Sequence, residues 1–180
     1  MLSLLIILVL IYGFYIGARR GLMMQLFYTA GYAVFFVIAA LSFKSLGPKF
    51  EMLIPYPSAT LDSKFAFFSN SLGIKLDSVF YSAFGFVFVC FVGWVVMRIA
   101  GLYFKRLTYF PMTNDVNVLS GGILGLIVNY IGIFLILLLM ALIPVAGLQD
   151  AMKHSFLASS IITSTPILTH NITNLWLSVL

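Results

Sequence analysis

Four long apolar runs constrain this 180-residue chain more than any other feature. They cover residues 1–18, 22–43, 79–104 and 119–143, and Arg98 is the single charged residue within them. A helix needs about 20 mostly apolar residues to cross the hydrocarbon layer of a bilayer, because each residue rises about 1.5 Å. The runs therefore predict an all-α integral membrane protein with four transmembrane helices.

The composition of the chain agrees with this class. Hydrophobic residues make up 62% of the sequence and charged residues 8%, whereas a soluble domain carries about a quarter charged residues. Disordered chains and free nucleic-acid-binding domains also need a high density of charge. We therefore expect one membrane domain over residues 1–180, with the lipid bilayer as its partner and without a nucleic-acid partner.

The first run differs from a secretory signal peptide. A signal peptide carries positive charge before its apolar stretch, whereas here Arg19 and Arg20 follow it and the next run begins almost at once. This order predicts an uncleaved helical hairpin. The third and fourth runs are joined by the short connection 105–118 and are predicted to form a second hairpin.

Lysine and arginine in the connections predict the orientation. The short connections 19–21 and 105–118 hold four basic residues and one acidic residue. The long stretches 44–78 and 144–180 hold five basic residues, nearly cancelled by four acidic ones. The short connections should therefore face the cytoplasm, with both termini and the long stretches outside. The residues that set this topology are Arg19, Arg20, Lys105 and Arg106.

The outer loop 44–78 is too long to lack structure of its own. Pro48 and the Pro55/Pro57 pair should break the second helix. A helix start near Ser58, followed by apolar residues at helical spacing, predicts a short amphipathic helix at the interface.

The outer C-terminal segment 144–180 has a similar pattern, and its polar content argues against full insertion. We expect it to lie on the outer face or to dip back between the spans after Pro166. Its predicted apolar stripe consists of Ile161, Leu168, Ile172, Leu175 and Val179.

Glycines recur at spacings that let helix backbones approach closely. We interpret them as packing positions within one chain. Assembly with a second copy or with partner membrane proteins is the alternative. The candidate packing residues are Gly13, Gly17 and Gly21 in the first hairpin and Gly121 and Gly125 in the fourth run, with Gly85, Gly93 and Gly101 repeating along the third.

Two polar side chains lie within the runs. Arg98 is near the cytoplasmic end of its helix, which favours snorkelling to the headgroups over a place in a polar pathway. Asn129 lies near the middle of the fourth run, where its amide should hydrogen-bond to another helix, with substrate contact as the alternative. Asn117 and Asp115 are predicted caps for the start of the fourth helix.

The sequence gives little support for catalysis. A metal site needs clustered ligands, and His154 and His170 stand apart in the C-terminal segment. Ser120, followed by two glycines, faintly resembles the nucleophile of an intramembrane serine protease. However, no run contains a histidine that could activate it. We therefore expect no enzymatic activity, no cofactor and no metal.

Three short motifs resemble the colicin V production protein family of bacterial inner-membrane proteins. These are Arg20-Gly21 at the end of the first run, Asn117-x3-Gly121-x3-Gly125 at the start of the fourth, and Ser155-x-Leu157 followed by Pro166. The chain has Met24-Gln25 where the family often has a glutamate.

The resemblance implies a multi-pass protein of the bacterial plasma membrane. Its implied role is production or export of a peptide toxin, with wider effects on biofilm and the envelope. A small transporter or channel subunit, with a polar pathway near Asn129 and Arg98, is the alternative function.

Overall fold

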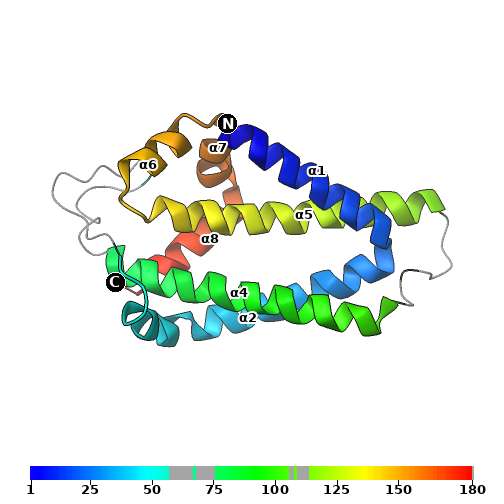
Figure 1. The fold of residues 1–180 in the computed structure, drawn as a ribbon, viewed down its shortest axis with the longest axis horizontal. Helices are drawn as coiled ribbons and strands as arrows, with labels where there is room; N and C mark the ends of the chain where they lie inside the picture. The colour runs from blue at the N-terminus through cyan, green and yellow to red at the C-terminus, as the bar shows by residue number, and fades with distance from the viewer. Residues whose placement is uncertain (57–66, 68–75, 106–107, 109–113, 180) are drawn as a thin grey trace. The chain divides into compact units, whose positions relative to one another are not determined.

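The computed structural model describes residues 1–56, 67, 76–105, 108 and 114–179 (Figure 1). All regular structure in this part of the chain is helical. Four helices are long and apolar enough to cross a membrane: α1 (Leu2–Arg20), α2 (Leu22–Glu51), α4 (Leu76–Tyr103) and α5 (Asn114–Ala141). Three shorter helices follow: α6 (Ala146–Lys153), α7 (Phe156–Ser164) and α8 (Pro166–Leu177). The predicted all-helical fold with four potential spans is confirmed.

The helix bounds differ from the apolar runs mainly in α2. This helix continues to Glu51, so the predicted break at Pro48 is wrong. Pro48 removes the backbone donor that would pair with the Lys44 carbonyl, yet the helix continues for three residues beyond it. The helix ends before Pro55 instead. Residue Leu76 begins α4, and the amphipathic helix predicted after Ser58 lies outside the described residues.

The long helices expose much of their apolar surface. Large side chains along α1, including Leu4, Leu8 and Ile11, are more than half exposed. A water-soluble protein would cover such a surface, whereas acyl chains cover it in a bilayer. The exposure therefore suits helices surrounded by lipid.

The chain forms two compact units. Unit 1 consists of Met1–Ser3, Ala39–Phe88 and Phe134–Leu180, and unit 2 consists of Leu4–Ile38 and Val89–Ile133.

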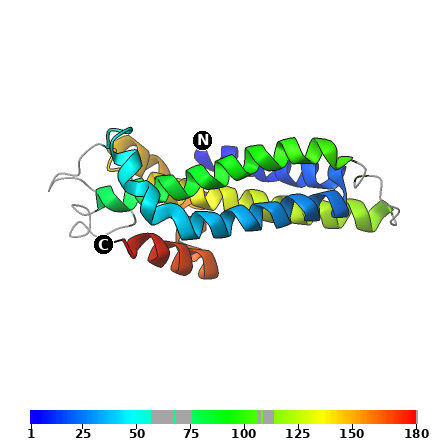
Figure 2. The same ribbon diagram turned by 90° about the horizontal axis from the view of Figure 1, so that it is seen from below.

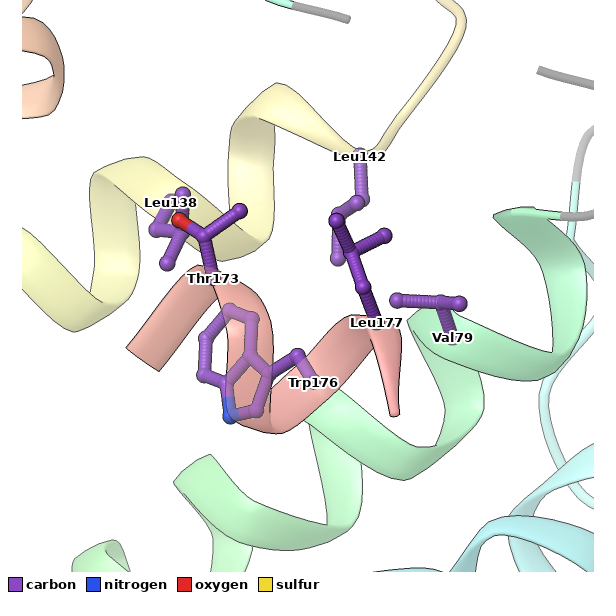
Figure 3. Close-up of a pocket in the computed structure, with 6 residues that line it drawn as sticks. All are labelled: Val79, Leu138, Leu142, Thr173, Trp176 and Leu177. Carbon is purple, nitrogen blue, oxygen red and sulfur yellow. The ribbon is translucent and has the colours of Figure 1, made fainter. Parts of the chain in front are cut away.

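Within unit 1, the C-terminal helices pack on segments of the long helices. The Trp176 ring of α8 meets Phe86 of α4 edge to face, with 5.8 Å between ring centroids. Just after α8, Lys44 Nζ of α2 donates a hydrogen bond of 3.0 Å to the Ser178 carbonyl oxygen. Figure 2 shows the ribbon of α8, in red, beside the C-terminal part of α2. Figure 3 shows a small apolar pocket between α4, α8 and the end of α5. Its lining residues are Val79, Leu138, Leu142, Thr173, Trp176 and Leu177.

The C-terminal stripe predicted from the sequence is divided between two helices. Thr165 lies between the end of α7 and the start of α8. Pro166 is the first residue of α8, a position that suits proline. Ile161 and Ile172 of the stripe are buried, whereas Leu168, Leu175 and Val179 are partly exposed. Trp176, which lies off the stripe, is 1% exposed and is among the most deeply buried side chains of unit 1.

Candidate functional site

A close backbone approach in unit 2 joins α1 to α5 through four glycines. A Cβ added at Gly17 would collide with the Gly121 carbonyl oxygen and would lie 2.9 Å from the Gly125 Cα. A Cβ at Gly125 would lie 2.5 Å from the Gly13 carbonyl oxygen. Only residues without a side chain permit this crossing, which Figure 1 shows between α1 and the first half of α5.

Gly21 and Asn117 extend the same contact to the start of α2. Gly21 has a φ of +76°, a left-handed conformation that favours glycine, and it makes the sharp turn between α1 and α2. Asn117 Oδ1 accepts a hydrogen bond of 2.7 Å from the Leu22 backbone N–H. The prediction that Asn117 caps its own helix is therefore wrong, because α5 begins three residues earlier, at Asn114.

Asn129 packs directly over Gly13, and a Cβ at that glycine would collide with the Asn129 amide. The amide Nδ2 donates a hydrogen bond of 2.8 Å to the Gly125 carbonyl oxygen of its own helix. The predicted hydrogen bond to another helix is thus replaced by one within α5. The Asn129 side chain thus occupies the space that a side chain at Gly13 of α1 would need.

Helices α2 and α4 also meet at glycines. A Cβ at Gly31 would collide with the side chain of Met97, and one at Gly93 would collide with Phe35. At Gly101, the missing Cβ makes room for the Tyr28 hydroxyl. Large side chains of one helix therefore fill the spaces above glycines of the other.

Arg20 and Arg98 lie among aromatic side chains. The Arg20 guanidinium carbon is 4.1 Å from the centroid of the Tyr28 ring. The Arg98 guanidinium carbon is 5.1 Å from the centroid of the Trp94 ring, one helical turn earlier in α4. The Arg98 Nε is buried and has no hydrogen-bond partner within the part of the chain that the structure describes. Arg98 is therefore partly buried and lies against the Trp94 ring, while its predicted snorkelling to the headgroups stays a prediction.

Arg19 and Lys105, which were also predicted to set the topology, are exposed. The Arg19 guanidinium carbon lies 5.7 Å from the Tyr15 ring centroid. Arg106 lies outside the described residues. Arg98 and Asn129 have different neighbours, Trp94 and Gly13 respectively.

Sequence reasoning did not single out two polar groups that close the end of α5 in unit 1. Gln149 is 3% exposed, and its Nε2 donates hydrogen bonds to the carbonyl oxygens of Ala141, at 3.1 Å, and Ile143, at 2.8 Å. The Tyr56 hydroxyl donates one of 2.7 Å to the Leu142 carbonyl oxygen. Pro144 was the signal in the sequence, because it ends the helix and leaves its last carbonyl groups without intrahelical donors.

Burial of the Tyr56 side chain affects the pKa of its hydroxyl. Desolvation, helped by the negative charge of Asp77 and by Tyr81, raises the pKa of Tyr56 from 10.0 to about 12. The phenol therefore remains a hydrogen-bond donor at any physiological pH. Among the described residues there is no group of three or more His, Cys, Asp or Glu side chains that could hold a metal ion.

Comparison with known proteins gives the class to which this arrangement belongs. Residues 2–166 match the model of the family described as colicin V production protein. The chain is also 28% identical over 177 residues to the uncharacterized transmembrane protein YshB of Bacillus subtilis (strain 168), covering 98% of this chain and 97% of that protein. No solved structure matches the chain.

Four potential spans and a transmembrane relative that matches nearly the whole chain indicate a multi-pass bacterial membrane protein. The chain belongs to the colicin V production protein family, as its motifs predicted.

Proposed function

We propose that this protein supports production or export of a peptide toxin and homeostasis of the envelope, as a structural component of the bacterial plasma membrane without enzymatic activity. The observation that carries the proposal is the family match over residues 2–166. Helix packing supports the structural part of it, since Gly13, Gly17, Gly121 and Gly125 are all used in contacts between α1 and α5.

The proposal includes the finer architecture expected from the sequence. The spans form two hairpins, with amphipathic segments on the outer face. The turn at Gly21 supports the first hairpin, because α1 ends at Arg20 and α2 begins at Leu22. Partner membrane proteins, or a second copy of the chain, would dock on the exposed apolar faces of the spans.

The function is tested by deleting the gene in its own host, or in a host that secretes a peptide toxin and carries a related gene. We expect less toxin in the culture medium, unchanged toxin synthesis and greater sensitivity to detergents. Wild-type protein supplied in trans should restore all three. Unchanged secretion and detergent resistance in the deletion strain would refute the proposal.

A transporter or channel subunit is the second candidate, favoured by the buried Nε of Arg98, which has no hydrogen-bond partner among the described residues. Substitution separates the candidates. If Arg98→Leu and Asn129→Leu proteins insert and remain folded but abolish secretion, a polar pathway gains. If both retain secretion while Gly17→Leu loses it, the structural role gains.

The orientation is tested with single cysteines in a Cys90→Ser background. Asn171 and Lys105 are both exposed, so a cysteine at either position is open to a label. We expect a membrane-impermeant thiol reagent to label Asn171→Cys in intact cells and to label Lys105→Cys only after lysis. The reverse pattern would overturn the proposal that both termini lie outside.

A further inference from the structure

Unit 2 brings two arginines from different helices to one place. Arg20, the last residue of α1, lies against the ring of Tyr28, whose hydroxyl sits over Gly101 of α4. Gly101 is three residues after Arg98, so both occupy one face of α4. The Tyr32 ring of α2 lies beside the Tyr28 ring, with 6.0 Å between ring centroids.

Within the part of the chain that the structure describes, no acidic side chain pairs with these arginines. By sequence, unit 2 contains five basic residues and one acidic residue, Asp115, which is exposed. The side-chain neighbour of Arg20 at hydrogen-bonding distance is the neutral amide of Gln25, whose Oε1 lies 3.4 Å from Nη1. Both guanidinium groups are positively charged, and Tyr28 links Arg20 to the face of α4 that carries Arg98. An anion bound by both would offset these charges.

The aromatic rings prepare both guanidinium groups for such an anion. A ring contacts the flat face of a guanidinium, which leaves the N–H donors at its edge free for the oxygens of a phosphate. Arg98 retains a buried Nε donor without a partner among the described residues. Tyr28 and Trp94 thus fix the arginines in place without using their edge donors.

The position along the helix indicates where the anion comes from. Helix α1 has 19 residues and is therefore about 28 Å long, which matches the hydrocarbon thickness. Its last residue, Arg20, then lies at the level of the lipid phosphates. Anionic headgroups at this level attract basic residues.

We propose that Arg20 and Arg98, held by Tyr28 and Trp94, form a binding site for the phosphate of an anionic phospholipid headgroup. A free phosphate offers the same chemistry, so the test includes both sources. The site does not depend on a role in toxin production.

The test uses purified full-length protein in detergent and native mass spectrometry, titrated with phosphatidylglycerol, with phosphatidylcholine, or with inorganic phosphate. We expect phosphatidylglycerol to bind in preference to phosphatidylcholine. Arg20→Gln and Arg98→Gln should each weaken that binding about tenfold. Arg19→Gln is the matched control, because it removes the same charge from the neighbouring exposed position, and it should change binding less than about twofold.

Gln25→Glu provides a variant that keeps both arginines. It places a carboxylate beside Arg20 and should weaken lipid binding about tenfold, even if an arginine variant fails to fold. Equal binding by wild type, Gln25→Glu and the folded arginine variants would overturn the site. Inorganic phosphate that binds with the same dependence on these variants, without any preference among the lipids, would overturn the lipid as its source.

Discussion

Asn117 of α5 caps the first turn of α2, since its Oδ1 accepts a 2.7 Å hydrogen bond from the backbone N–H of Leu22. The two residues are 95 positions apart in the chain. The first N–H groups of a helix have no partner inside that helix, and in a membrane an unpaired donor is costly. One side chain thus fixes the turn between α1 and α2 to the start of α5.

Replacing Asn117 with alanine should therefore destabilise the protein. We expect the free energy of unfolding to fall by about 1 kcal/mol, the usual value of a lost cap. Titration with sodium dodecyl sulfate in mixed micelles measures the change. Asn171→Ala, at an exposed position of α8, is the control and should leave the midpoint unchanged. Equal midpoints for the two variants would show that the cap contributes nothing.

The crossing of α1 and α5 gives a stronger test at Gly17. A methyl group there would meet the backbone of Gly121 and Gly125, so Gly17→Ala should lower the free energy of unfolding by about 1–3 kcal/mol. Gly132, also in α5, has nothing within 4 Å of an added Cβ. Gly132→Ala should cost nothing, because alanine favours helix over glycine by about 1 kcal/mol. Thermal unfolding of both variants in the same detergent makes the comparison, and a smaller loss at Gly17 than at Gly132 would contradict the crossing.

Gln149 should matter for the end of α5. Removing its amide in Gln149→Ala leaves the carbonyl groups of Ala141 and Ile143 without this donor. We expect the free energy of unfolding to fall by about 1–3 kcal/mol, measured by titration with sodium dodecyl sulfate in mixed micelles. The neighbouring Asp150 is exposed, so Asp150→Asn should have almost no effect. A loss equally large at Asp150 would argue against a specific role for the Gln149 amide.

Tyr56 predicts a dependence of stability on pH. Its pKa is raised to about 12 in the folded protein, from 10.0 without the fold, so the folded state holds the proton more tightly. The resulting stability is fully present below pH 10 and is lost as the pH rises from 10 through 12. Tyr56→Phe lacks both this term and the hydrogen bond to Leu142. Unfolding midpoints across that pH range should show the advantage of wild type over Tyr56→Phe shrinking, and a constant difference would refute the shift.

Much of the fold could be predicted from the sequence because apolar length is a local property. The runs at residues 1–18, 22–43, 79–104 and 119–143 correspond to α1, α2, α4 and α5. The end of α2 could not be predicted in this way. Lys44 and Pro48 interrupt the apolar run, yet the helix continues to Glu51, where packing overrides local preference. One sign of this packing is that a Cβ added at Gly47 would lie 2.5 Å from the Ser82 Oγ.

The sites needed three-dimensional information. Glycine spacing pointed to Gly17, Gly121 and Gly125, but the spacing alone could not tell which helix each glycine meets. The capping of Leu22 by Asn117 depends on the crossing of two helices and leaves no local pattern. In the same way, nothing in the sequence near Arg98 indicates that Tyr28, which carries Arg20 on its ring, packs on the same face of α4.

We propose that this protein acts in secretion through the packed contact of α1 and α5. The most direct test is secreted toxin from the deletion strain complemented with Gly17→Leu or with Gly132→Leu. The two substitutions are chemically the same, and the membrane level of each protein is measured alongside. We predict that Gly132→Leu restores secretion to the wild-type amount and that Gly17→Leu does not. Full secretion with Gly17→Leu would contradict the account.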